Sequence, residues 1–307
     1  MLQPTALSQG RVGRRAFLAG SLAATAAAFA PRGMALTTDP ARPTPTFCAF
    51  IKFVQSLGYE EMAARIAELG FDGIESTVRR GGHVLPQRVE EDLPRQVEAV
   101  RKHGMDVTIM TTDVLGLDDP LTEKVLRTAA KLGIKKYRMG FYRYSPKRSV
   151  MAQLDEIRPR LRDLAAFNRE LGLTAVYQNH SGSHYVGAPI WDLHYLFKGI
   201  PVDEVGIAFD IRHATAEGGL SWPIQYDIMK PHIGAMFVKD FTWRGPRTEH
   251  VPLGKGRVER RFFQMHAKSG IHVPYSVHVE YLGHAGVEEN LAALKTDLKT
   301  LQSWLAS

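Results

Sequence analysis

The feature that most constrains the fold is a repeated alternation of short apolar runs with amphipathic stretches that end in glycine. Stretches such as YEEMAARIAELG and LTEKVLRTAAKLG have helical periodicity, and an apolar run follows each of them at once. A glycine just past the last periodic residue is a typical helix stop. Strand, helix, glycine and strand in this order predict βα units with short turns, and so a parallel sheet. The glycines that close these helical stretches are Gly70, Gly104, Gly133 and Gly172.

Eight such units fit the chain. Together they occupy roughly 260 residues, which is typical of a single (β/α)8 TIM barrel of the α/β class. A last amphipathic stretch, GVEENLAALKTDLKTLQSWL, would close the ring, so we expect one barrel domain over residues 46–307. The rival is a doubly wound open sheet, but no glycine-rich phosphate loop follows the first strand, which argues against its nucleotide-binding form. The predicted strands are 46–51, 72–76, 106–111, 135–139, 173–178, 205–209, 233–239 and 275–280.

The amino-terminal residues have the layout of an export signal. Arg14 and Arg15 precede a moderately apolar, alanine-rich run, and small residues follow it. The paired arginines resemble a twin-arginine signal, with a Sec signal or an uncleaved anchor as alternatives. The run is short and weakly hydrophobic for a transmembrane helix. We therefore expect a signal peptide at 1–35, a Pro- and Thr-rich spacer at 36–45, and a periplasmic or otherwise exported protein with no stable membrane span after cleavage.

The charge balance gives no indication of nucleic-acid binding. The chain has 39 Lys and Arg against 32 Asp and Glu, a net charge of +7, but residues 1–35 hold four arginines and no acid. The remaining 35 basic and 32 acidic residues give only +3, too small a surplus for a nucleic-acid footprint. Cys48 is the single cysteine, which excludes an intramolecular disulfide. The domain must therefore be stable by its core alone.

Chemically capable side chains gather where the predicted strands end, which is where a TIM barrel carries its active site. Asp210 and His213 are three residues apart at the end of one strand, and Glu280 lies two strands away. Carboxylate oxygens and imidazole nitrogens in such an arrangement suit Mn²⁺, Zn²⁺, Mg²⁺ or Co²⁺. Trp243 could supply an aromatic wall for a sugar. The other candidates at or just after strand ends are Lys52, Glu75, Gln178, His180, Lys239 and His278.

Six segments, in this order, resemble the recurring segments of the xylose-isomerase-like TIM barrels, the sugar phosphate isomerase/epimerase superfamily. They are LGFDGIE, QNH, FDIRHA, VKD, PLGKG and HVEY, and the resemblance extends over residues 46–303. It implies one divalent metal ion held by Glu, Asp, His and Glu at the ends of strands five to eight. Asp210 and Glu280 match two of these positions, whereas Gln178 and Phe237 occupy the other two. Phenylalanine cannot bind a metal, and glutamine cannot act as a base.

The resemblance also implies a carbohydrate-active enzyme that acts on a small sugar or sugar derivative. The reaction would be proton abstraction next to a carbonyl, with one divalent ion (Mn, Zn, Mg or Co) polarising that carbonyl. Reprotonation would give isomerisation or epimerisation, and association of several copies is left open. The expected metal ligands are Asp210 and Glu280, followed by His213 and His180. The expected catalytic residues are Glu280, His180, Glu75 and Lys239, and the expected substrate contacts are Gln178, His278, Lys52 and Trp243.

Two other functions remain open on these residues. Loss of one glutamate from the usual pair, together with export, favours a lyase that eliminates from an oxidised (keto) glycoside. Gln178 and Phe237 also fit a non-catalytic barrel that binds sugar. An abasic-site nuclease of the same superfamily would need a richer set of histidines and acids for several zinc ions, so we set this function aside.

Overall fold

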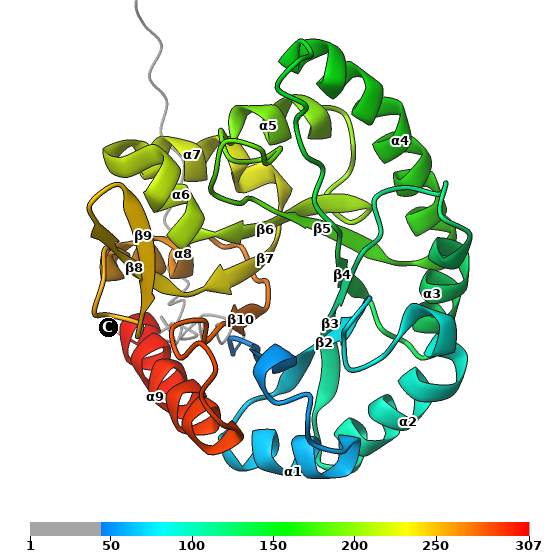
Figure 1. Ribbon diagram of the computed structural model, residues 1–307, viewed down its shortest axis with the longest axis vertical. Coiled ribbons are helices and arrows are strands. Elements are labelled where there is room, and N and C mark those ends of the chain that lie inside the picture. The colour runs from blue at the N-terminus through cyan, green and yellow to red at the C-terminus, as the bar shows by residue number, and fades with distance from the viewer. Residues whose placement is uncertain (1–43, 307) are drawn as a thin grey trace, which may run out of the picture. The chain divides into compact units, whose positions relative to one another are not determined.

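The computed structural model describes residues 44–306, which form a closed parallel barrel of eight strands inside a layer of helices (Figure 1). Going around the barrel, the strand order is β1-β10-β7-β6-β5-β4-β3-β2. This confirms the predicted (β/α)8 barrel. The expected signal peptide and most of the expected spacer lie outside the described residues.

The predicted strands and helices are present with small shifts at their ends. The longest helix, α4, begins at Ser149, whose side chain caps it, and ends at Gly172 with a positive φ of 64°. The barrel strands are β1 (Phe47–Phe50), β2 (Gly73–Val78), β3 (Asp106–Thr112), β4 (Lys136–Arg138), β5 (Thr174–Gln178), β6 (Val205–Asp210), β7 (Ile233–Val238) and β10 (Tyr275–Val277). The α-helices are α1 (Tyr59–Glu68), α2 (Val89–Lys102), α3 (Pro120–Lys131), α4 (Val150–Leu171), α5 (Trp191–Phe197), α6 (Ile211–Gly218), α7 (Trp222–Met229), α8 (Arg260–Ala267) and α9 (Val287–Leu305).

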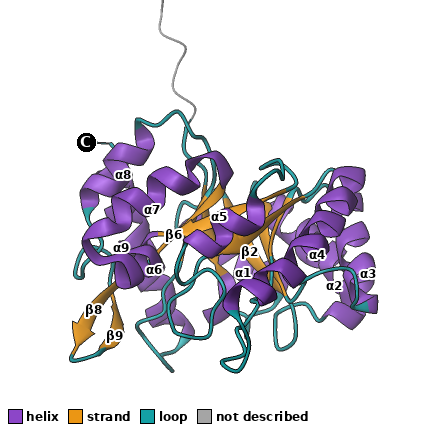
Figure 2. Cartoon of the chain, turned by 90° about the horizontal axis from the view of Figure 1, so that it is seen from above, coloured by secondary structure: helices purple, strands orange, loops and turns teal. Residues whose placement is uncertain are grey.

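A two-stranded hairpin, which the sequence did not indicate, follows β7. Strands β8 (Asp240–Arg244) and β9 (Arg247–Val251) pair antiparallel with each other and with no barrel strand. Figure 2 shows the hairpin projecting beyond the helices at one edge of the molecule. The hairpin begins at the residue after Lys239, so it rises directly from the carboxyl end of the barrel.

The interior of the barrel is divided into an apolar floor and a polar layer. Because side chains alternate along a strand, residues two apart point to the same side. On β5, Val176 belongs to the floor and Gln178 to the polar layer. On β6, Ala208 and Asp210 are divided in the same way. The functional candidates therefore lie on a closed hydrophobic base. The floor consists of Cys48, Ile109, Val176, Ala208, Ala235 and Phe237, all fully buried.

The carboxylate of Asp240 holds the loop that contains the PLGKG segment. It accepts hydrogen bonds from the backbone N–H groups of Phe241 (2.8 Å), Gly254 (3.0 Å), Gly256 (3.0 Å) and Val258 (2.9 Å). Gly256 must be glycine for this approach, because a Cβ there would lie 2.2 Å from the carbonyl oxygen of Phe241. The VKD and PLGKG segments are thus two parts of one structural unit.

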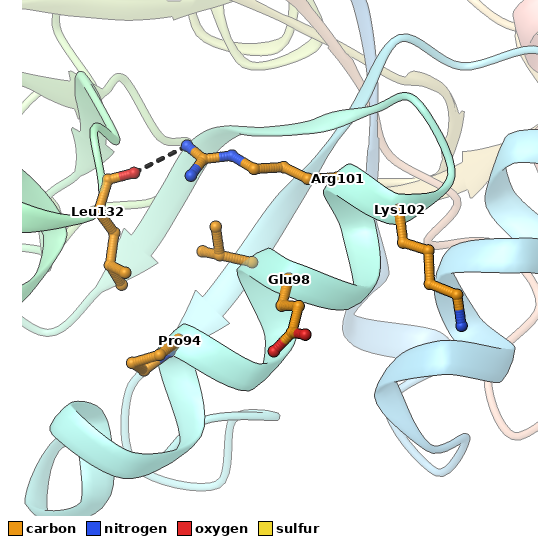
Figure 3. A pocket seen from close by; sticks show the side chains of 6 residues that line it. Pro94, Glu98, Arg101, Lys102 and Leu132 are labelled. Carbon is orange, nitrogen blue, oxygen red and sulfur yellow. Dashed lines mark hydrogen bonds between the residues drawn. The ribbon is translucent and has the colours of Figure 1, made fainter.

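A surface groove of about 520 Å³ lies between α2 and the end of α3 (Figure 3). Its basic residues already have partners: Arg101 Nη2 donates to the Leu132 carbonyl oxygen (2.7 Å), and Lys102 pairs with Glu60 (2.8 Å). Helices run back antiparallel to the strands, so the ends of α2 and α3 lie at the amino end of the barrel, away from the polar layer. Within residues 44–306, no helix is long and apolar enough to span a membrane.

Candidate active site

The ammonium group of Lys239 lies between two carboxylates at the carboxyl end of the barrel. Its Nζ is 3.2 Å from Asp210 Oδ2 and 3.4 Å from Glu280 Oε2. Lys239 and Asp210 are almost completely buried, whereas the side chain of Glu280 is 22% exposed. The sequence placed these residues on three different strands, and the closed barrel brings them together. Of the two carboxylates, Glu280 is the one that solvent or a substrate can reach.

The QNH segment at the end of β5 fixes Asp210 from the side. Gln178 Nε2 donates to Asp210 Oδ2 (2.7 Å). Asn179 makes a pair of hydrogen bonds with the Asp210 backbone, donating to its carbonyl (3.0 Å) and accepting from its N–H (2.7 Å). With its amide nitrogen on Asp210, Gln178 keeps its carbonyl oxygen without a partner among residues 44–306. That oxygen is available to accept a hydrogen bond from a substrate hydroxyl.

The imidazole of His213 is held in a single tautomer. Its Nδ1 accepts from the Ser181 backbone N–H (3.1 Å), and Arg212 Nη1 lies 2.9 Å from the same atom. Both partners are pure donors, so Nδ1 must carry the lone pair. Burial first, then the nearby charge of Lys239, holds the pKa of His213 well below its usual range, and the ring is neutral. Its proton is therefore on Nε2, which lies 3.6 Å from Asp210 Oδ2.

His180 presents the opposite tautomer. Its Nδ1 lies 2.9 Å from the Ser181 carbonyl oxygen and must donate to it, which leaves the lone pair on Nε2. The ring stacks between His213 (centroids 4.1 Å apart) and Tyr185 (4.0 Å). Burial lowers the pKa of His180 to about 4, so the ring is neutral at physiological pH. His180 can accept a hydrogen bond from a sugar hydroxyl without competing for a proton.

Glu75 and His278 form a sealed ion pair beneath the mouth of the barrel. His278 Nε2 lies 2.8 Å from Glu75 Oε2, and Ser276 and Thr111 also donate to this carboxylate. Burial alone would raise the pKa of Glu75 and lower that of His278, but the attraction between their charges reverses both shifts. Glu75 is fully buried and His278 is packed against Phe50. The pair supports Glu280 from below, since His278 Nδ1 lies 3.8 Å from Glu280 Oε1.

The hairpin and two arginines add residues that the sequence did not single out. His250 on β9 places its Nε2 3.4 Å from Glu280 Oε2. Arg212 joins α6 to the hairpin through a hydrogen bond from Nη2 to Thr248 Oγ1 (2.6 Å). Arg138, at the end of β4, is 4% exposed, and burial lowers its pKa to about 10. The sequence signal for Arg138 was available, because it ends a strand, whereas His250 lies on a hairpin with no apolar alternation.

Two expected substrate contacts, Lys52 and Trp243, are exposed side chains on segments next to the barrel strands. Lys52 is exposed on the short helix Ile51–Phe53 after β1, with its Nζ 5.0 Å from the centre of the Phe53 ring. Trp243 lies on β8 and is 46% exposed. Among residues 44–306, no hydrogen bond or ion pair joins Lys52 to Asp210 or Glu280. The roles of Lys52 and Trp243 in substrate binding stay predictions.

The donor set does not fit a divalent metal ion. Asp210 and Glu280 already share the Lys239 ammonium, Gln178 turns an N–H toward Asp210, and the only ring nitrogen of His213 near Asp210 carries a proton. Phe237 is fully buried in the apolar floor, where a further ligand would be expected. Across the described part of the chain, no three side chains of His, Cys, Asp and Glu are grouped so that they could hold a metal.

Comparison with known proteins identifies a family. The family model described as "Xylose isomerase-like TIM barrel" matches residues 63–304. A search of curated proteins finds no match to this chain.

Solved structures with the same fold include three proteins of low sequence identity. The 3-keto-D-glucoside 4-epimerase from E. coli is 16% identical (TM-score 0.64), over 85% of this chain and 100% of that one. A xylose isomerase-like TIM barrel protein from Mycobacterium smegmatis, solved in complex with magnesium, is 16% identical (TM-score 0.63), over 85% and 98%. A protein from Bacillus anthracis, described as the "probable 3-DHS dehydratase" involved in petrobactin synthesis, is 16% identical (TM-score 0.64), over 84% and 99%. At this identity they support the fold of the chain.

Proposed function

Since this chain belongs to the xylose isomerase-like TIM barrel family, we propose that it is an enzyme that removes a proton next to the carbonyl of a sugar. The observation that carries the proposal is the position of Lys239 between Asp210 and Glu280 at the mouth of the barrel. An ammonium group in a buried site can donate to a carbonyl oxygen and stabilise the enediolate that forms when the proton leaves. A partly exposed carboxylate next to it can take the proton.

Glu280 is the proposed base. Burial alone would raise its pKa, but Lys239, His278 and His250 together hold the pKa well below the usual range in the free protein. A carboxylate in this state is a weak base. As the proton leaves, negative charge develops on a carbonyl oxygen that is hydrogen-bonded to Lys239, and this charge offsets the field of the ammonium group and raises the pKa of Glu280. The reaction itself would therefore strengthen the base at the moment when it is required.

The neighbouring polar atoms suit the hydroxyl groups of a sugar. Gln178 offers a free carbonyl oxygen, and His180 offers the lone pair of Nε2. Both are acceptors, so each would take a hydrogen bond from a substrate hydroxyl. One base with two neutral acceptors suits return of the proton to a neighbouring carbon, which is isomerisation. Epimerisation would need a second acid on the opposite face.

A second candidate is elimination from a keto glycoside. The same first step, proton abstraction by Glu280, leads to loss of a β-substituent if the enediolate expels a leaving group. The arrangement favours this outcome in one respect, because Gln178 stands where a second carboxylate would return the proton. The Bacillus anthracis protein of the same fold is described as a "probable" dehydratase, and dehydration is also an elimination.

Solvent deuterium exchange tests the proposed function directly. We expect the protein to incorporate deuterium next to the carbonyl of a keto-sugar or a 3-keto-glycoside, measured by NMR over a substrate panel. Glu280→Gln should lower the exchange rate by about 10²–10⁴-fold, because it removes the base while keeping the shape of the side chain. Release of a free aglycone in the same spectra would assign elimination.

The control is Glu289→Gln, an exposed acid on α9 that should exchange at the wild-type rate. If wild-type protein binds sugars but catalyses no exchange or elimination with any of them, the proposal fails and a non-catalytic sugar-binding barrel remains.

We also propose export through the twin-arginine pathway, on the strength of Arg14 and Arg15 before an apolar, alanine-rich run. Replacing both arginines by lysine should keep the protein in the cytoplasm with its leader attached. Cell fractionation with mass determination of the mature chain measures this. Export of the double variant at the wild-type level would contradict the pathway.

A further inference from the structure

We propose that the ammonium group of Lys239 takes the place of a divalent metal ion, so that this enzyme works without one. The inference has two halves. The binding half, that the site holds no divalent ion, is argued from the charges and contacts of the site. The catalytic half, that Lys239 supplies the positive charge that stabilises the enediolate, rests on the proposed function.

The first argument concerns the lone pairs of Asp210. Its Oδ2 faces three nitrogen atoms: Gln178 Nε2 at 2.7 Å, Lys239 Nζ at 3.2 Å and His213 Nε2 at 3.6 Å. Gln178 donates to this oxygen and Lys239 pairs with it, whereas the protonated Nε2 of His213 lies just beyond hydrogen-bond distance and has no hydrogen-bond partner among residues 44–306. The other oxygen, Oδ1, accepts a hydrogen bond from the His213 backbone N–H (3.1 Å), so a metal ion bound to either oxygen of Asp210 would have to displace donors that are already in place.

The second argument concerns charge. Asp210 and Glu280 together supply two negative charges, and Lys239 neutralises one of them from a position 3.2 Å and 3.4 Å away. His213 adds no charge in this arrangement, because its Nδ1 accepts from the Ser181 N–H and faces Arg212 Nη1, so the ring carries a proton only on Nε2. With Arg138 and Arg212 nearby, the site already holds three positive charges against two negative ones, and a divalent ion would raise this excess from one to three. In a largely buried space such an excess is strongly unfavourable.

The third argument concerns the side chains that surround the carboxylates. The amide of Gln178 adds a donor where an anionic ligand would add charge, and Phe237 fills its position with hydrocarbon, 4.6 Å from His278 between ring centroids. Gln178 and Phe237 therefore bring less negative charge and fewer lone pairs to the site than two ligand side chains would. Such a site suits the single positive charge of Lys239 better than the double charge of a metal ion.

The deciding experiment is a metal titration of wild-type protein and Lys239→Met. Full-length protein folded in cells is analysed by elemental mass spectrometry and then titrated with Mn²⁺, Zn²⁺ and Co²⁺ by calorimetry, with Co²⁺ absorption as a second readout. We expect the wild type to carry no stoichiometric metal. Removing the ammonium takes one positive charge from between two carboxylates, so Lys239→Met should bind a divalent ion at least tenfold more tightly than the wild type. Asp210→Asn added to Lys239→Met should abolish this gain.

The opposite results overturn the inference. One outcome is about one metal ion per wild-type chain that is lost in Asp210→Asn. This would show that the site binds a metal and that Lys239 is only its neighbour. The comparison does not depend on whether Lys239→Met folds. Unchanged deuterium exchange after chelator treatment supports the catalytic half. If the wild type is metal-free and exchanges no substrate, the charge replacement stands and the proposed function fails, so the two outcomes are distinguishable.

Discussion

Replacing Lys239 by methionine is expected to lower the rate of proton exchange by about 10²–10³-fold, the usual effect of removing a donor that stabilises a developing oxyanion. The same change leaves Asp210 fully buried and without its ammonium partner. Breaking a buried ion pair by removing one partner costs about 3–5 kcal/mol of unfolding free energy. Deuterium exchange by NMR and chemical denaturation measure the two effects separately.

The double variant Lys239→Met/Asp210→Asn separates charge balance from catalysis. Neutralising Asp210 removes the uncompensated carboxylate, so a large part of the lost stability should return. Activity should not return, because the cation that stabilises the enediolate is still absent. If Lys239→Met alone keeps wild-type exchange rates, the ammonium has no part in the reaction.

Replacing Asp240 by alanine is expected to lower the free energy of unfolding by about 3–5 kcal/mol, because four backbone N–H groups lose a charged acceptor at once. These donors belong to Phe241, Gly254, Gly256 and Val258, and Asp240 itself is 1% exposed. Chemical denaturation measures the loss. Limited proteolysis should cut within residues 252–258 earlier than in the wild type.

The matched control for Asp240 is Asp227→Ala. Asp227 is exposed and, among residues 44–306, pairs only with Lys230 across one helical turn (2.7 Å), so its loss should change stability by less than about 1 kcal/mol. Asp240→Asn should fall between the two, since its amide keeps one of the two acceptor oxygens. Equal stability of Asp240→Ala and Asp227→Ala would refute a structural role for the VKD and PLGKG segments.

Much of the fold could be predicted from the sequence, because each βα unit carries its own local signal. Helical periodicity, glycine stops such as Gly172 and buried apolar runs are properties of short segments. The hairpin Asp240–Val251 could not be predicted in this way. Its strands are short and partly exposed. They are fixed by contacts of Asp240 with Val258, 18 residues away, and of Arg212 with Thr248, 36 residues away, which no local pattern predicts.

The candidate site was predictable as a set of strand ends but not as a set of roles. Strand ends identify Asp210, Lys239 and Glu280, and closure of the barrel brings them together. The local sequence does not show which partner donates in a hydrogen bond. Whether His213 offers a proton or a lone pair depends on Ser181 and Arg212, which the fold places against its Nδ1.

The apolar floor of the barrel also acts on the electric field of the site. Hydrocarbon from Cys48, Phe237 and their neighbours closes one end, so the field of the polar layer can spread into water only through the mouth. Confinement of this kind focuses the potential on whatever enters. Arg138, Arg212 and Lys239 carry three positive charges there, while the charges of Glu75 and His278 cancel and leave Asp210 and Glu280 as the two opposing anions. An incoming molecule therefore meets a slightly positive funnel, which draws in electron-rich oxygens and turns small cations away.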